Sequence, residues 1–230
     1  MRSWPPLVLF DLDDTLFDHR GSSRRTLAHM AHDWPALARL SLDQLWDHYH
    51  RILEELHVRV MRGQLSPEDS RTQRSARLFA DCGETLSAAE AERFGIDFRE
   101  AYQRLRFPVD GAAELLAAVR RQSRVGIVSN NLTAEQEDKL RHCGLDSLID
   151  FMVTSEDVGM LKPEPGIFQA ALAAGGFGAE QAVMVGDNWE VDIVGALAVG
   201  LRCIWFDREG LPRALPASVE RITGLAELLA

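Results

Sequence analysis

The sequence predicts an α/β fold, in which a Rossmann-like parallel sheet carries an inserted α-helical domain, and three observations lead to this class. Continuously apolar runs of strand length recur along the chain, as is typical of strands buried on both faces of a sheet. Amphipathic segments of helix length alternate with these runs from residue 108 onward. Helical periodicity also fills the long interval between the first two runs, although a crossover between parallel strands needs only about a dozen residues.

Five apolar runs are expected to form the strands of the sheet, at 7–10, 124–130, 150–154, 182–187 and 203–207. Helical patterns follow at 111–122, 134–143, 165–175, 190–199 and 218–229. Thr133 and Gln136 have the spacing of a capping box at the start of the helix at 134–143, and Gly144 is expected to end it. This alternation indicates βαβ crossovers and therefore parallel strands with helices on both faces.

The interval between the first two strands is expected to form a helical bundle of its own. Its helices are predicted at 23–34, from Ser41 to about Arg62, from the SPED motif at 66–69, and from the SAAE motif at 87–90 to about Leu105. Acidic and Arg side chains balance within this interval, so the net charge of −10 belongs to the rest of the chain. We therefore predict an α/β core at 1–17 and 108–230 and a helical domain at 18–107.

Composition limits the partners and the compartment. A net charge of −10 argues against nucleic acid as a partner, because phosphate backbones are bound by basic surfaces. Apolar runs are too short for a membrane span and the first residues do not resemble a signal peptide, so we expect a cytoplasmic protein without membrane association. The spacing of Cys82, Cys143 and Cys203 indicates reduced thiols rather than a metal site.

Polar side chains follow four of the predicted strands, at the points where those strands end. In chain order they are Asp11 and Asp13, Ser129 and Asn130, Lys162, and Asp187 and Asp192. Because the carboxyl ends of parallel strands meet at one edge of the sheet, we expect these side chains to lie together. One lysine cannot balance so many carboxylates, and oxygen ligands without His or Cys are those that Mg²⁺ prefers. A Mg²⁺ site with a phosphoryl group as its ligand is therefore predicted, although these arguments do not choose between Asp11 and Asp13 as the nucleophile.

The motifs DLDDTL at 11–16 and GDNWEVD at 186–192, with Ser129 and Lys162 between them, resemble the haloacid dehalogenase-like hydrolase superfamily in its phosphatase branch. The resemblance implies that Asp11 is the nucleophile and that Asp13 is the general acid and base. It also implies that the Ser129 hydroxyl and the Asn130 backbone N–H bind the phosphoryl oxygens. Lys162 would neutralise both the phosphate and the nucleophile.

The same resemblance implies a metal site, a cap and a substrate class. Mg²⁺ would be held by Asp11, by the Asp13 carbonyl and by Asp187, with Asp192 supporting these ligands, and the helical insert would be the cap domain. The implied activity is Mg²⁺-dependent hydrolysis of a small phosphorylated metabolite, namely a sugar phosphate, phosphoglycolate or a nucleoside monophosphate, through an aspartyl-phosphate. The protein would act as a monomer or homodimer.

The same residues are compatible with other activities. A phosphomutase of the same family keeps every motif, whereas a 2-haloacid dehalogenase is disfavoured by Asp13 and Asp187. A receiver-like signalling domain also combines acids with a hydroxyl and a lysine, but it has no inserted bundle. Lys139 falls inside a helical pattern, so we expect it to lie away from the site and its replacement by alanine to be nearly silent.

Overall fold

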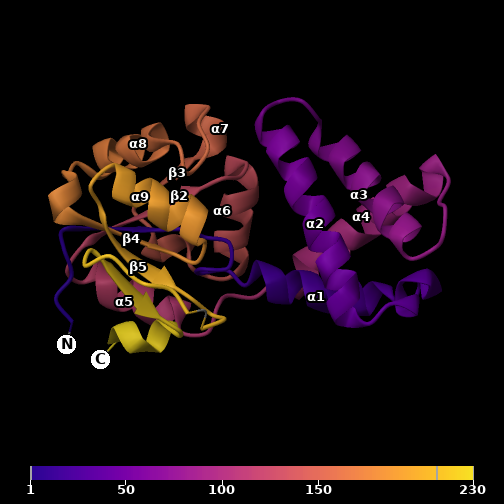
Figure 1. Ribbon diagram of the computed structural model, residues 1–230, viewed down its shortest axis with the longest axis horizontal. Helices are drawn as coiled ribbons and strands as arrows, with labels where there is room; N and C mark the ends of the chain where they lie inside the picture. The colour runs from indigo at the N-terminus through magenta and orange to yellow at the C-terminus, as the bar shows by residue number, and fades with distance from the viewer. Residues whose placement is uncertain (1, 211, 230) are drawn as a thin grey trace. The chain divides into compact units, whose positions relative to one another are not determined.

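The computed structural model describes residues 2–210 and 212–229, and within these residues six parallel strands form one sheet in the order β3-β2-β1-β4-β5-β6 (Figure 1). The strands are β1 (Leu7–Phe10), β2 (Arg124–Ser129), β3 (Phe151–Thr154), β4 (Ala182–Gly186), β5 (Arg202–Phe206) and β6 (Val219–Ile222). Leu7 of β1 lies opposite Arg124 of β2 and opposite Ala182 of β4, so β1 is central. The predicted fold class and the five predicted strands are confirmed.

The expectation of a helix at 218–229 is wrong. The chain instead forms the edge strand β6, which pairs with β5, and then the short 3₁₀ helix η5 (Leu225–Leu229). Val219, Ile222, Leu225 and Leu228 are buried, and their spacing of three residues imitates a helical stripe. Because a 3₁₀ helix also repeats every three residues, the pattern alone could not separate these structures.

Helices cover both faces of the sheet, as Figure 1 shows with α8 and α9 on one side and α5 on the other. They are α5 (Ala112–Arg120), α6 (Thr133–His142), α7 (Ser155–Val158), α8 (Pro165–Gly175) and α9 (Val194–Ala198), with the short turns η2 (Asp146–Leu148) and η3 (Ala179–Gln181). The helix predicted at 190–199 begins as a π-helical turn, η4 (Trp189–Ile193), before α9. Gly144 follows α6 with a φ of 66°, which suits the glycine expected to end that helix.

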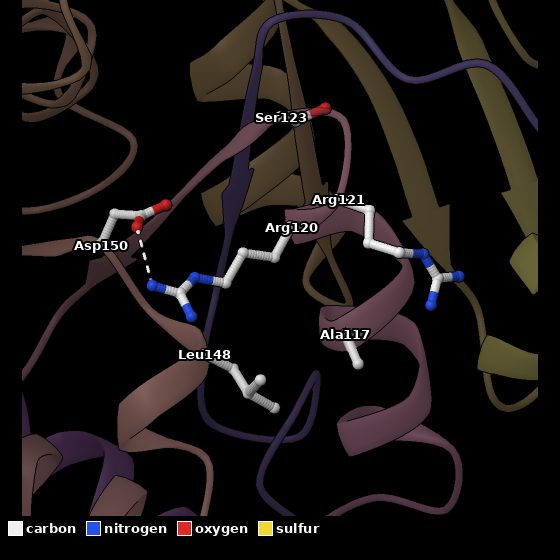
Figure 2. A pocket seen from close by; sticks show the side chains of 6 residues that line it. All are labelled: Ala117, Arg120, Arg121, Ser123, Leu148 and Asp150. Atoms are coloured by element: carbon white, nitrogen blue, oxygen red, sulfur yellow. Dashed lines mark ion pairs between the residues drawn. The ribbon is translucent and has the colours of Figure 1, made fainter.

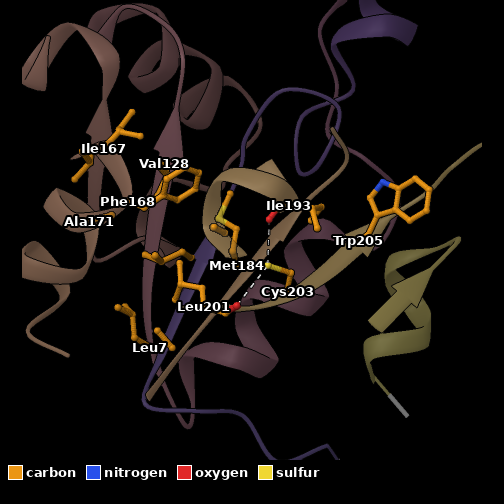
Figure 3. Close-up of a cluster of buried hydrophobic side chains, with 14 of the residues drawn as sticks. Leu7, Val128, Ile167, Phe168, Ala171, Met184, Ile193, Leu201, Cys203 and Trp205 are labelled. Carbon is orange, nitrogen blue, oxygen red and sulfur yellow. Dashed lines mark hydrogen bonds between the residues drawn. The ribbon is translucent and has the colours of Figure 1, made fainter. Parts of the chain in front are cut away.

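The hydrophobic core of the sheet is continuous with the helices that cover it. Figure 3 shows the cluster in which Leu7 of β1 and Met184 of β4 meet Phe168 of α8 and Ile193 of η4. All four side chains are fully buried. Burying an aliphatic or aromatic side chain of this size stabilises a fold by about 1.5–3 kcal/mol. The strands are therefore held rigidly, and so are the residues that follow their carboxyl ends.

Residues His19–Arg106 form a second compact unit, whereas residues up to Asp18 and from Phe107 onward form the unit that contains the sheet. The second unit consists of α1 (His19–Met30), η1 (Pro35–Arg39), α2 (Leu42–Met61), α3 (Pro67–Asp81) and α4 (Ala88–Leu105). Ser41 and Ser87 make the capping boxes that begin α2 and α4. Trp34, Phe79 and Phe94 pack edge to face in its core. No helix in the described ranges is long and apolar enough to cross a membrane.

Candidate active site

The order of the strands places two aspartates at the point where the sheet changes direction. The chain runs from β1 outward to β2 and β3, and then returns to place β4 on the other side of β1. Ligands of open α/β sheets bind outside the carboxyl ends of the strands at such a switch point. Asp11 follows β1 there, and its backbone N–H donates to the carbonyl of Val185 at 2.9 Å. Asp187 follows β4, and the indole N–H of Trp205 donates to its carbonyl at 2.8 Å.

Lys162 joins two of the predicted carboxylates. Its Nζ lies 2.6 Å from Oδ1 of Asp11 and 2.7 Å from Oδ1 of Asp192, and all three residues are buried. Burial lowers the pKa of the ammonium, but the charges of Asp11 and Asp192 raise it, and the net pKa lies above its ordinary value. The lysine is therefore charged at every physiological pH.

Asn130 fixes the loop that carries this lysine. The Asn130 amide donates to the carbonyl of Lys162 at 2.9 Å, and the Lys162 N–H donates to the Asn130 side chain at 2.6 Å. This pair of hydrogen bonds locks the backbone of the loop to the end of β2. The sequence alone assigned only the backbone N–H of Asn130 to the site, as a donor to the phosphoryl oxygens. The structure adds the contact of the Asn130 side chain with the backbone of Lys162.

Asp11, Asp187 and Asp192 form an acidic triad that can hold a metal ion. One carboxylate oxygen from each lies within 4.8 Å of the other two. Among the described residues, Oδ2 of Asp11 is buried without a hydrogen-bond partner. Burial, partly offset by Lys162, raises the pKa of Asp11 to about 7, and burial with the charges of Asp11 and Asp192 raises that of Asp187 well above its ordinary value. Lys162 is one ammonium beside three carboxylates, so ionisation of all three leaves negative charge uncompensated, and a divalent cation fits the triad.

The π-helical turn after β4 brings Asp192 into the triad. The N–H of Asn188 donates to Oδ2 of Asp192 at 3.0 Å, while the Asn188 side chain accepts the N–H of Val191 at 3.1 Å. Gly186 makes room for this arrangement, because a Cβ atom there would lie 2.5 Å from Oδ2 of Asp192. A π-helical turn often marks a functional site, and here it aims a carboxylate back at the sheet.

Asp13 lies in a second polar cluster, next to the triad, and this cluster corrects two expectations. Lys139 was expected to lie away from the site, but its Nζ is 2.5 Å from Oδ1 of Asp13. Thr133 and Gln136 were expected to form a capping box at the start of α6, but Leu132 is the cap residue and makes no side-chain capping bond. The Gln136 amide instead donates to Oδ2 of Asp13 at 2.9 Å and to the hydroxyl of Ser129 at 2.5 Å.

The sequence alone placed none of Gln136, Lys139 and Thr15 in the site, although each contacts a predicted site residue. The Thr15 hydroxyl accepts the N–H of Asp187 at 3.1 Å and lies 3.3 Å from its carboxylate. Thr15 belongs to the DLDDTL motif and lies two residues after Asp13, so the sequence could have indicated that it is part of the site. The sequence signal for the two residues of α6 was weaker. Gln136, Lys139 and Leu140 lie on one face of the helix, and this face is buried in the structure. From the sequence alone, a helix face that carries a glutamine and a lysine is normally assigned to solvent.

An open pocket lies at the other edge of the sheet, where β2 and β3 begin (Figure 2). It is lined by Ala117, Arg120, Arg121, Ser123, Leu148 and Asp150, and Arg120 forms an ion pair with Asp150 at 3.5 Å. Among the described residues that line this pocket, Asp150 is the one acid and it is paired with Arg120, so the pocket has no group of acids like the triad.

Comparison with known proteins decides the family. A family profile described as haloacid dehalogenase-like hydrolase matches residues 5–200. The chain belongs to the haloacid dehalogenase-like hydrolases. Membership in this family confirms the resemblance read from the DLDDTL and GDNWEVD motifs, and it makes the protein an enzyme of the hydrolase class.

Relatives within the haloacid dehalogenase-like hydrolases align along most of the chain. The chain is 31% identical to pyrimidine 5′-nucleotidase YjjG of Escherichia coli, across 87% of this chain and 85% of that protein. It is 30% identical to a phosphoserine phosphatase of Thermus thermophilus, across 96% of this chain and 97% of that protein. The crystal structure of the putative HAD-hydrolase YfnB from Bacillus subtilis, bound to magnesium, superimposes with a TM-score of 0.78 at 24% identity, across 98% and 97% of the two chains. The inserted helical region is therefore part of a known fold.

Proposed function

We propose that this hydrolase is a Mg²⁺-dependent phosphatase that acts on small phosphomonoesters through an aspartyl-phosphate on Asp11. The observation that carries the proposal is the buried contact of Lys162 with Asp11 inside the acidic triad. A nucleophilic carboxylate, a fixed cation beside it and a metal-binding group of acids are the components that phosphoryl transfer requires. Asp13 supplies the fourth component, an acid whose side chain is less buried than that of Asp11.

Each residue has a separate task in this proposal. A carboxylate oxygen of Asp11 attacks phosphorus, and the bond from phosphorus to the ester oxygen breaks while Asp13 gives that oxygen a proton. Water then attacks phosphorus and loses a proton to Asp13, which releases inorganic phosphate and restores Asp11. Lys162 stabilises the negative charge of the phosphoryl oxygens, and the Ser129 hydroxyl and the Asn130 N–H bind these oxygens.

Asp11, the Asp13 carbonyl and Asp187 would hold Mg²⁺, and Asp192 would support them. The donor set fits this ion because it contains oxygen atoms only and because Oδ2 of Asp11 is buried without a partner among the described residues. When bound, the ion supplies positive charge that offsets the carboxylates and the phosphoryl group.

Asp13 is the residue that favours phosphate-ester hydrolysis over dehalogenation. Release of a halide ion needs no proton donor, whereas release of an alkoxide does. The structure surrounds Asp13 with three side chains, Asn131, Gln136 and Lys139, which donate to its carboxylate. Gln136 and Lys139 are buried, and a network of buried polar groups around one carboxylate supports a role for that acid in the reaction.

The substrate class is proposed from the relatives together with the site. One relative carries the name of a pyrimidine 5′-nucleotidase and another that of a phosphoserine phosphatase, so the aligned proteins differ in leaving group and share a phosphomonoester. We infer that this chain also acts on a small phosphorylated metabolite, with sugar phosphates, phosphoglycolate and nucleoside monophosphates as the first to test. A phosphomutase would use the same residues and return the phosphoryl group to a second sugar hydroxyl.

A phosphatase screen tests the proposal directly. Phosphate release from a panel of phosphorylated metabolites is measured with Mg²⁺, with a chelator, and with the Asp11→Asn variant. We expect release from at least one class of ester, dependent on Mg²⁺ and absent in the variant. Conversion of a sugar phosphate into its isomer without phosphate release would identify the mutase instead.

Chemical trapping tests the intermediate. An acyl phosphate is reduced by borohydride, so quenching during turnover should convert Asp11 into homoserine, detected by peptide mass spectrometry. Rapid phosphate release with no modification at Asp11 would show that water attacks the ester directly.

A further inference from the structure

Helix α6 brings a buried cation and a buried amide to Asp13. Lys139 and Gln136 lie one turn apart on the same face of this helix, and both are buried. The ammonium of Lys139 is 2.5 Å from Oδ1 of Asp13, and the amide of Gln136 is 2.9 Å from Oδ2. The two oxygens of one carboxylate are thus held by two different donors from one rigid element.

The cost of burying these groups indicates that their contacts are specific. A buried ammonium without a partner would lose several kcal/mol of hydration (roughly), and a buried amide also needs its hydrogen bonds. For Lys139, the ion pair with Asp13 offsets this loss, and so does a cation–π contact with the ring of Phe17, whose centroid is 5.2 Å from Nζ. The chain contains two lysines, and each of them pairs with a different aspartate of the DLDDTL motif, Lys162 with Asp11 and Lys139 with Asp13.

Gln136 also connects Asp13 to the phosphate-binding residues. The same amide nitrogen that reaches Asp13 lies 2.5 Å from the hydroxyl of Ser129. Ser129 ends β2, so the orientation of Asp13 is tied to the sheet itself rather than to the loop in which Asp13 resides. A carboxylate held at both oxygens has lost the side-chain rotation that would otherwise move it away from a leaving group.

We propose that Lys139 and Gln136 are positioning residues that hold the carboxyl group of Asp13 in the orientation from which it transfers a proton to the leaving group. This inference rests on the proposed phosphatase function. Proton transfer by a positioned side chain contributes about 10²–10⁴-fold to a rate, and it matters most for leaving groups that are poor without a proton. A positioning defect therefore shows itself in how the rate depends on the leaving group.

The test measures kcat/KM of the Mg²⁺-loaded enzyme for dinitrophenyl, nitrophenyl and phenyl phosphate and for an alkyl phosphate. Because kcat/KM reports the steps up to leaving-group release, Lys139→Met should lose little with the dinitrophenyl ester and about 10²-fold with the phenyl and alkyl esters. Gln136→Met should show the same trend with a smaller loss. Arg141→Met, an exposed change on the same helix, should leave the whole series unchanged.

A double-mutant cycle separates positioning from a direct or merely structural role. If Lys139 acts through Asp13, Lys139→Met should cost almost nothing in an Asp13→Asn background. An equal loss for all esters, or a loss that persists in that background, overturns the inference, because Lys139 would then act on the phosphoryl group or on the fold. Thermal unfolding of each variant shows whether it folds like the wild-type protein. If Lys139→Met does not, the leaving-group series is measured with Gln136→Met instead. A wild-type enzyme inactive towards every ester overturns the proposed function as well, whereas an unchanged leaving-group dependence in an active enzyme overturns this inference alone.

Discussion

The ammonium of Lys162 lies 2.6 Å from the carboxylate of Asp11, and both side chains are almost completely shielded from solvent. The same nitrogen contacts Asp192 at 2.7 Å. Two carboxylates that approach one another in a buried site repel strongly unless a cation lies between them. Lys162 therefore has a structural effect on the geometry of the triad in addition to the role proposed for it with the phosphoryl group.

Replacement of Lys162 by alanine should remove most of the activity. We expect kcat to fall by about 10²–10³-fold, as is usual when one charge-stabilising donor is removed from such a site. The control is Arg202→Ala, which removes an exposed cation from the amino end of β5 and should leave kcat unchanged. Steady-state kinetics on one phosphate ester compare the two variants, and similar small effects would show that Lys162 does not contribute to the reaction.

Gly186 should not tolerate a side chain. In Gly186→Ala the new Cβ would lie 2.5 Å from Oδ2 of Asp192, so the π-helical turn must shift, with an expected loss of about 1–3 kcal/mol in the free energy of unfolding. Gly224→Ala is the matched control, because no atom lies within 4 Å of its new Cβ. Denaturant unfolding of both variants measures the difference. Equal stabilities would mean that Asp192 can move away without cost.

The sequence predicted the elements whose periodicity is long and regular, and it missed features that depend on tertiary contacts. The strand ends that carry Asp11, Ser129 and Asp187 were identifiable, because buried parallel strands are continuously apolar and stop abruptly at polar residues. Strand β6 was mistaken for a helix because it is a short edge strand followed by a 3₁₀ turn with the same apolar spacing. At this edge of the sheet, local pattern and final structure disagree.

The candidate site shows the same division. Motif spacing brought attention to Lys162 but not to Lys139, since a lysine within a helical pattern is usually a solvated residue. Only the path of α6 across the carboxyl edge reveals that Lys139 and Gln136 face Asp13. Tertiary placement of this kind leaves only a weak mark in the sequence, here the spacing of Gln136, Lys139 and Leu140 along one face of the helix.

Metal binding should stabilise the fold through Asp187. An ion that binds only the folded state adds about 2.7 kcal/mol to the free energy of unfolding at a concentration 100 times its dissociation constant. We expect Mg²⁺ to raise the Tm of the wild-type protein and to have almost no effect on Asp187→Asn. Glu190→Gln, an exposed change in the same turn, should keep the full shift. An undiminished Mg²⁺ shift in Asp187→Asn would place the ion elsewhere, and the measurement needs no activity assay.

The raised pKa of Asp11 predicts how stability depends on pH when the metal is removed. Burial, partly offset by Lys162, raises this pKa to about 7 in the folded protein, whereas an aspartate in the unfolded chain titrates near about 3.9. Between these values the folded state binds more protons than the unfolded state, so the contribution of Asp11 to stability falls as the pH rises. The slope is at most about 1.4 kcal/mol per pH unit, and the loss is complete above pH 7 or so.

Subtraction removes the contribution of the titrating groups that do not interact with Asp11. The free energy of unfolding is measured in chelator from pH 5 to pH 8 for the wild-type protein and for Asp11→Asn, which cannot titrate at this position. The wild-type protein should lose stability relative to the variant as the pH rises through the interval, and saturating Mg²⁺ should reduce the difference because bound cation favours the ionised carboxylate. Parallel curves in chelator would show that Lys162 compensates the burial of Asp11 completely, and the triad would then carry less uncompensated charge than its geometry indicates.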